Sequence, residues 1–149
     1  MLFECEYPYA RDPFIYVEDN IYYCIYTDDA CIKYRTSTDM LNWSEEKILQ
    51  RKFLHAAETE SPFLMKKGDM YYLFWSICDG RCGAYDWRTF VFAAKDFEKL
   101  DLYAPITMLK GHAVEIVQDD CGNDYLLSAY YPQNGISAIK LKWLQVGRD

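Results

Sequence analysis

Three segments of the chain share one pattern: an apolar strand, a polar turn and an aromatic strand. The first copy covers 12–27 and the second covers 61–76, with Pro13 standing 49 residues before Pro62. The third copy covers 115–128. A turn of Asp, Asn, Gly or Lys residues between two strand-like runs predicts a β-hairpin in each copy. Self-similarity at a fixed period indicates a repeat architecture, so this feature restricts the fold more than any single motif.

The third copy is aligned through its aromatic residue. Ile116 stands nine residues before Tyr125, as Phe14 stands nine before Tyr23, so Ile116 is predicted to take the place of Phe14. A further strand-like run follows each hairpin and brings every unit to at least three strands; these runs are 31–37, 89–94 and 136–141.

The repeat length indicates the architecture. A period of about 50 residues with three or four strands per unit is typical of propeller blades. We therefore predict an all-β fold, a partial β-propeller of about three blades with antiparallel three- or four-stranded sheets. We expect one domain, 1–149, with blade repeats at about 9–57, 58–108 and 109–149. The polar turn at 95–100 leads to an aromatic residue that is expected to plug the gap between blades.

Charge and composition exclude several classes of partner. The net charge of −7, with no run of Lys or Arg, makes nucleic acid an unfavourable partner. No stretch reaches the roughly 20 apolar residues of a membrane helix, and no export signal opens the chain, so we expect a cytoplasmic protein. The six cysteines lack the paired spacing of a structural zinc site, and no glycine-rich phosphate loop is present. We therefore predict neither a metal nor a cofactor.

Acidic residues are predicted to fall just ahead of the first strand in successive repeats. Asp12 and Glu60 occupy what look like matching places, with Glu58 as a rival to Glu60, and the third repeat offers His112 and Glu115. Equivalent positions on adjacent blades converge in space, and converging carboxylates are what glycoside hydrolysis requires. The alternative is that Asp12 and Glu60 only cap the turns before proline.

Five strings, taken together in their order and spacing, resemble the five-bladed propeller glycoside hydrolases of families 43 and 32. They are Ala-Arg-Asp-Pro at 10–13, Tyr-Arg-Thr-Ser-Thr-Asp-Met-Leu-Asn-Trp-Ser at 34–44, Thr-Glu-Ser-Pro-Phe at 59–63, Tyr-Tyr-Leu-Phe at 71–74 and Gly-His-Ala-Val-Glu at 111–115. The resemblance covers nearly the whole chain and corresponds to the C-terminal three blades of those enzymes.

The resemblance implies roles for individual residues. Asp12 corresponds to a transition-state stabiliser or pKa modulator, and Glu60 to a general acid. Arg11 corresponds to a contact with a sugar hydroxyl, and His112 lies near the floor of the funnel. The family's nucleophile or base aspartate lies on a blade upstream of the Arg-Asp-Pro motif, and only eleven residues precede Asp12 in this sequence.

Aromatic residues are further candidates for sugar binding. Trp75 and Trp87 have flat apolar faces that suit the C–H face of a pyranose or furanose, although packing between blades explains most such residues equally well. We include Trp75, Arg11, Glu58 and His112 among the predicted substrate-binding residues. The segment 76–87 reads as a loop, and loops at a funnel mouth commonly carry specificity.

These observations predict a glycoside hydrolase-like protein that acts on or binds a carbohydrate. The alternative is a non-catalytic carbohydrate-binding or structural propeller fragment that lacks the blade with the nucleophile or base. Three blades do not close a ring, so we also expect a homodimer that covers two open blade faces.

Overall fold

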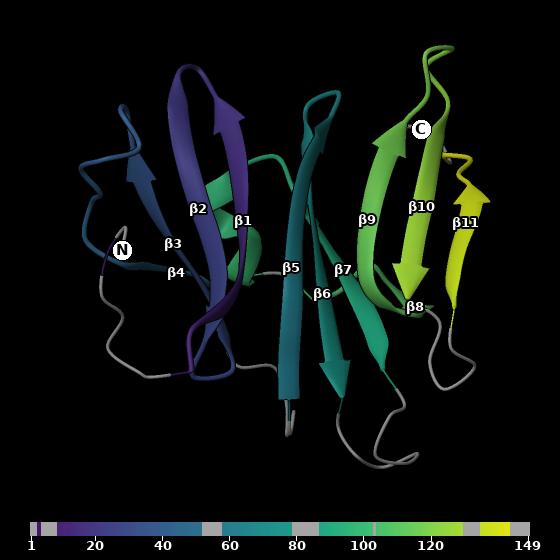
Figure 1. Ribbon diagram of the computed structural model, residues 1–149, viewed down its shortest axis with the longest axis horizontal. Helices are drawn as coiled ribbons and strands as arrows, with labels where there is room; N and C mark the ends of the chain where they lie inside the picture. The colour runs from purple at the N-terminus through teal and green to yellow at the C-terminus, as the bar shows by residue number, and fades with distance from the viewer. Residues whose placement is uncertain are drawn as a thin grey trace.

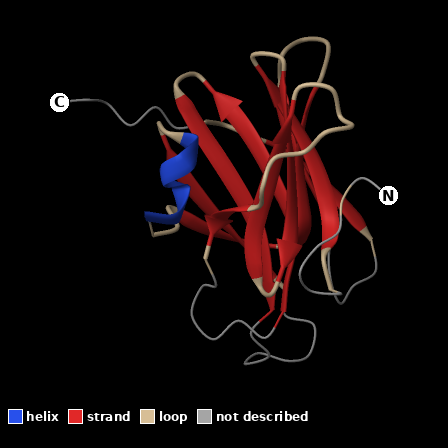
Figure 2. Ribbon diagram, turned by 90° about the vertical axis from the view of Figure 1, so that its left-hand side faces the viewer, coloured by secondary structure: helices blue, strands red, loops and turns tan. Residues whose placement is uncertain are grey.

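The computed structural model describes residues 3, 9–51, 58–78, 87–102, 104–129 and 135–143. These residues form three antiparallel sheets that stand side by side (Figure 1). The only helical segment in this part of the chain is the short 3₁₀ helix η1 (Phe97–Leu102) (Figure 2). The prediction of an all-β fold built from three blade-like sheets is confirmed.

Each sheet follows the order of its strands in the chain. The first contains β1 (Arg11–Glu18), β2 (Ile21–Asp28), β3 (Cys31–Ser37) and β4 (Lys47–Gln50). The second contains β5 (Glu58–Lys67), β6 (Met70–Cys78), β7 (Arg88–Ala94) and β8 (Thr107–Lys110). The third contains β9 (His112–Gln118), β10 (Asp124–Ala129) and β11 (Ile136–Lys140). β8 thus ends two residues beyond the blade boundary expected at 108.

The hairpin turns differ in length between the repeats. Asp19 and Asn20 form the two-residue turn after β1 with φ of 50° and 62°, the left-handed pair that such turns favour. The turn after β9 is one residue longer, because the Asp119 N–H donates to the Asn123 carbonyl across three residues. This extra residue shifts β9 relative to β10.

The shift corrects the alignment of the third repeat. Phe14 pairs with Ile25, and Phe63 pairs with Phe74 at the equivalent place in the second sheet. In the third sheet Glu115, not Ile116, occupies this place, opposite Leu127. The prediction that Ile116 is equivalent to Phe14 is therefore wrong by one residue.

Two hydrophobic clusters hold the blades together. The larger lies between the first and second sheets, and helix η1 fills its outer margin, where Leu100 is fully buried and the Phe97 ring lies 5.1 Å from that of Tyr23. The smaller lies between the second and third sheets around Phe74 and Val114. Sheet-to-sheet burial of apolar side chains therefore fixes how the three first strands meet.

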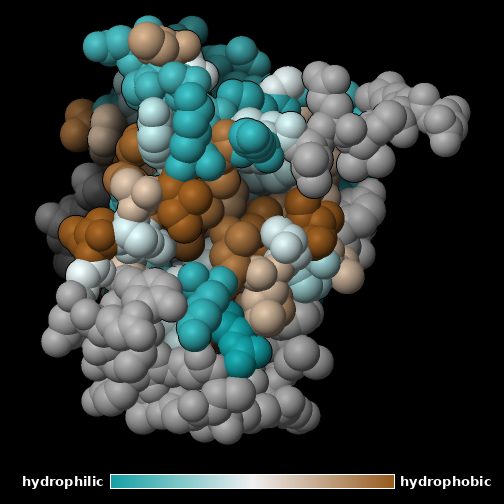
Figure 3. Space-filling model, turned by 90° about the vertical axis from the view of Figure 1, so that its right-hand side faces the viewer, coloured by the Kyte–Doolittle hydropathy of each residue, from teal (hydrophilic) through white to brown (hydrophobic). Residues whose placement is uncertain are grey.

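The outer faces of the first and third sheets, at the two ends of the structure, differ in exposure. On the outer face of the first sheet Cys24 and Tyr26 are 2% exposed, and the Phe3 ring lies 5.6 Å from the Tyr26 ring. On the outer face of the third sheet Val117 is 41% and Ile136 is 83% exposed. Figure 3 views the molecule from this side and shows hydrophobic side chains gathered in the middle of the face. The expectation of two bare end faces is therefore wrong for the first sheet.

In the part of the chain that the structure describes, no helix is long and apolar enough to span a bilayer.

Candidate functional site

The first strands of the three sheets share one irregularity. Asp12, Ser61 and Ala113 have φ of 56°, 52° and 50°, and each lies where the register of its strand shifts against the next strand. A left-handed backbone costs a non-glycine residue roughly 1–2 kcal/mol, so its recurrence at three equivalent places marks a built feature. Bulges of this kind re-aim side chains and are frequent beside active sites.

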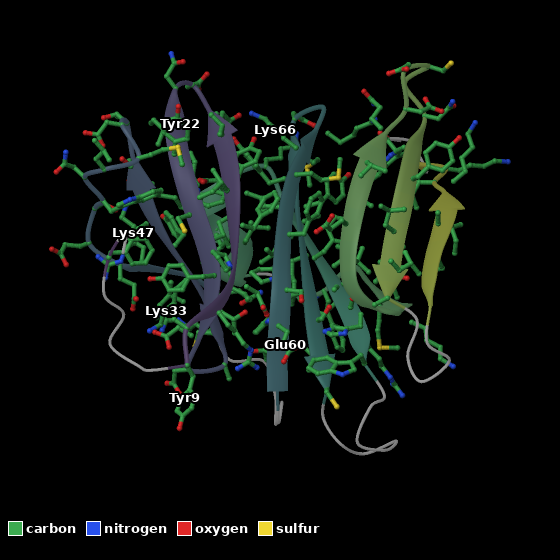
Figure 4. The ribbon with its side chains drawn as sticks, in the orientation of Figure 1. Tyr9, Tyr22, Lys33, Lys47, Glu60 and Lys66 are labelled. Carbon is green, nitrogen blue, oxygen red and sulfur yellow. The ribbon has the colours of Figure 1, made fainter. Side chains whose placement is uncertain are left out.

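The bulges bring the preceding residues together in one layer across the three blades. Arg11 NH2 lies 3.2 Å from Glu60 Oε1, and His112 Nε2 lies 3.0 Å from Glu60 Oε2. Arg11 also donates to the Thr59 carbonyl at 3.1 Å. Figure 4 shows Glu60 near one end of β5 and Lys66 near the other. The Glu60 side chain keeps 26% of its surface exposed, so this layer is accessible to a ligand.

Asp12 occupies the next layer rather than the same one. Its Oδ2 accepts a hydrogen bond of 2.9 Å from the Ser61 N–H and lies 3.9 Å from Arg11 Nε. Asp12 is therefore equivalent to Ser61, and Arg11 is equivalent to Glu60. Because Asp12 and Glu60 both contact the Arg11 guanidinium, their carboxylates lie within the distance of about 10 Å used in glycoside hydrolysis. Both residues lie within the first strands, not ahead of them.

Buried hydroxyl groups support the His112 segment from behind. Ser76 Oγ lies 3.1 Å from Thr89 Oγ1 and accepts a hydrogen bond of 3.0 Å from the Ala113 N–H. Thr89 Oγ1 donates to the Gly111 carbonyl at 3.0 Å. A Cβ on Gly111 would stand 3.0 Å from Ser128 Oγ, so the close approach of β9 to β10 favours glycine. These contacts set the start of β9 and hence the position of His112.

The structure separates the two tryptophans that were both predicted as candidates for stacking on a sugar. Trp87, directly before β7, stacks on His112 with ring centroids 4.4 Å apart and an interplanar angle of 16°. Trp75 is fully buried in the cluster between the first two sheets and presents no ring face to a ligand. β6 is buried on both faces from Leu73 to Cys78. An alternating pattern of apolar and polar residues therefore could not indicate that the Trp75 ring is buried.

Glu58 forms the first residue of β5 and pairs with Cys78, while its side chain lies outside the described part of the structure. Among the described residues no group of three or more His, Cys, Asp or Glu side chains could hold a metal ion.

A pocket of about 190 Å³ lies directly beyond the Arg11–Glu60–His112 layer. Its wall consists of the same three-residue segment from each first strand: 12–14, 61–63 and 113–115. Two acidic residues, Asp12 and Glu115, belong to these segments. The site therefore consists of three converging polar side chains, Arg11, Glu60 and His112, beside a pocket that the first strands of all three sheets line.

Comparison with known proteins identifies the fold. No family model matches the chain, and no curated protein matches it in sequence. An endo-arabinase from Bacteroides thetaiotaomicron matches with a TM-score of 0.70 at 18% identity, over 89% of this chain and 50% of that chain. An exo-1,5-α-L-arabinanase from a bovine ruminal metagenomic library matches with 0.68 at 20% identity, over 92% and 54%. A Bombyx mori GH32 β-fructofuranosidase matches with 0.58 at 20% identity, over 80% and 29%.

These likenesses establish a partial β-propeller of the kind found in GH43 and GH32 enzymes. They confirm the structural resemblance that the sequence motifs indicated. The chain spans about half, or less, of the length of the proteins that it matches.

Proposed function

We propose that the chain binds carbohydrate at the Arg11–Glu60–His112 layer and takes part in glycoside hydrolysis. The observation that carries this proposal is the convergence of three equivalent first-strand residues on one carboxylate, beside a pocket that Asp12 also lines. A charged rim that presents donors and acceptors over a small apolar-walled pocket suits a sugar ring, whose edge is hydroxylated and whose face is apolar.

Each residue has a role in this proposal. Glu60 is the general acid that protonates the leaving oxygen, and Asp12 is the neighbouring carboxylate that stabilises the transition state or modulates Glu60. Arg11 and His112 hold the two oxygens of Glu60 and are displaced in part by sugar hydroxyls. Trp87 supports His112 by stacking.

The proteins of similar fold suggest the substrate class. They include arabinanases, a xylan β-1,4-xylosidase, a β-1,3-galactosidase and a β-fructofuranosidase. We propose a furanoside or pyranoside of this group for the present chain.

The contacts of Glu60 also favour a second function, carbohydrate binding without catalysis. Both oxygens of Glu60 already have basic partners, Arg11 on Oε1 and His112 on Oε2, an arrangement that suits binding of hydroxyl groups as well as proton donation. A non-catalytic carbohydrate-binding protein therefore stands as the alternative.

We also propose that two copies of the chain pair, and that the pairing involves only the exposed outer face of the third sheet.

A panel of aryl arabinofuranosides, xylosides, galactosides and fructosides distinguishes the two functions. Release of the aryl alcohol supports hydrolysis, whereas ligand-observed NMR binding without release supports the alternative. Glu45→Gln, an exposed change of the same chemistry, serves as the control. Absence of both release and binding across the panel contradicts the proposed function.

A further inference from the structure

We infer that residues 144–149 dock in a pocket between the second and third sheets, where they take the place that helix η1 takes between the first and second sheets. This pocket shares no residue with the carbohydrate site, so the inference goes beyond the proposed function and does not depend on it. Residues 144–149 follow Trp143 directly and lie outside the described part of the chain.

The pocket has a volume of about 340 Å³ and lies between β8 of the second sheet and β10 and β11 of the third. Its apolar wall consists of Leu109, Leu126, Ile139 and Leu141, and Ile139 is 60% exposed. Packed elements leave few spaces wider than a water molecule between them. A space of this size between two packed sheets is therefore suited to a further apolar segment.

Helix η1 fills the corresponding space between the first and second sheets. Leu49 of β4 and Leu100 of η1 are buried there in one cluster, and Gln50 Nε2 donates to the Leu100 carbonyl at 3.4 Å. Leu109 belongs to the fourth strand of the second sheet, as Leu49 belongs to the fourth strand of the first. In the described part of the chain Leu109 lines the pocket instead of packing against a helix.

Trp143 marks the start of the segment that corresponds to η1. Phe97 stands three residues beyond the end of β7, and Trp143 stands three residues beyond the end of β11. The Phe97 ring lies 5.1 Å from that of Tyr23 at an interplanar angle of 62°. The Trp143 ring lies 5.0 Å from that of Tyr72 at 55°. Because Tyr23 and Tyr72 occupy the same place in the second strands of their sheets, Trp143 is the counterpart of Phe97.

Counting on from these two rings assigns the pocket to Val146. The fully buried Leu100 stands three residues after the aromatic residue of η1, and Val146 stands three residues after its counterpart. By the same count Gln145 corresponds to Lys99, whose side chain is 58% exposed. An apolar residue therefore falls at the buried place and a polar residue at the exposed one, as in η1.

NOE spectroscopy of the methyl-labelled chain tests the docking directly. We expect cross peaks from the methyl groups of Val146, assigned through Val146→Ala, to those of Leu109 and Leu126. In a mixed sample of labelled and unlabelled chains these cross peaks are expected within one chain only. Val146 methyl groups without a contact to the pocket overturn the inference. Cross peaks between different chains also overturn it, because they assign the pocket to a second copy.

Two neighbouring substitutions test what the docked segment contributes to stability. Val146→Asp places a charge in the apolar pocket and is expected to lower Tm by at least about 3 °C. Gln145→Asp adds the same charge at the place of the exposed Lys99 and is expected to change Tm by less than about 1 °C. Val146→Leu, which copies the residue of η1, is expected to keep the wild-type Tm or raise it. Equal Tm values for Val146→Asp and Gln145→Asp overturn the inference.

Discussion

His112 Nε2 lies 3.0 Å from Glu60 Oε2 and thereby joins the second blade to the third. Arg11 completes the contact from the first blade, because its NH2 lies 3.2 Å from the other oxygen of Glu60. These three residues stand at equivalent positions, each directly before a left-handed residue of a first strand. The repeat of one backbone irregularity therefore places three different side chains on one site.

His112→Ala is expected to weaken sugar binding by at least about tenfold while changing stability little. The pair with Glu60 is partly exposed, and such pairs contribute only about 0.2–1 kcal/mol to folding. Ligand-observed NMR and thermal unfolding measure the two effects. Lys95→Ala removes the exposed pair with Asp69 and serves as the control, with unchanged binding. Unchanged sugar binding in His112→Ala contradicts the site.

Asp124 is expected to make stability depend on pH. Hydrogen bonding from Lys67, together with that from Trp143 and Gln118, holds the pKa of Asp124 below its usual 3.8 against the opposing effect of burial. A lowered pKa in the folded state means that the stabilisation is complete above the usual value and is lost as pH falls through the lowered one.

Urea unfolding of wild type and Asp124→Asn measures this effect. The stability difference is expected to be largest at neutral pH and to shrink progressively below pH 3.8. Asp69→Asn, at an exposed position, is the control. A stability difference that stays constant across this range rules out the assigned role of Asp124.

Leu100→Ala tests the plug that helix η1 forms between the first two blades. Leu100 is fully buried, so we expect a loss of about 2–5 kcal/mol in the free energy of unfolding. Leu41→Ala, at a residue that is 78% exposed, is expected to change it by less than about 0.5 kcal/mol. Equal effects of the two variants in chemical denaturation exclude a docked helix.

The open face of the third sheet predicts association. Light scattering at micromolar concentration is expected to give twice the monomer mass of 17.6 kDa. Ile136→Asp, which charges an 83% exposed residue of that face, is expected to return the chain to the monomer mass. A wild-type monomer at this concentration contradicts the pairing.

The sequence predicted the hairpins well because their turn chemistry is local. Asp19-Asn20 and Gly68 adopt the left-handed conformations that short hairpin turns require. The third repeat was misaligned because its turn has one more residue, and counting back from Tyr125 cannot show where a turn ends. Glu115 was therefore not recognised as the equivalent of Phe14 and Phe63.

Other parts of the site depend on contacts between distant segments. Asp12 and Glu60 looked equivalent in the sequence, yet the bulges place Arg11 beside Glu60 and Asp12 one layer further in. The contact of Trp87 with His112 joins the residue before β7 to the first residue of β9, and no local pattern predicts it. The sequence around Trp75 and Trp87 does not indicate which of the two rings is buried, because only packing between the sheets decides this.

Glu60→Gln, assayed on a series of aryl glycosides whose leaving groups differ in basicity, tests the central claim most directly. A general acid matters most when the leaving oxygen needs a proton, so the account predicts a loss of about 100-fold or more for basic leaving groups and a small loss for a dinitrophenyl group. Sugar binding is expected to persist. A loss in Glu60→Gln that is equal for all leaving groups, or no loss at all, contradicts the assignment of Glu60 as the acid of a carbohydrate site.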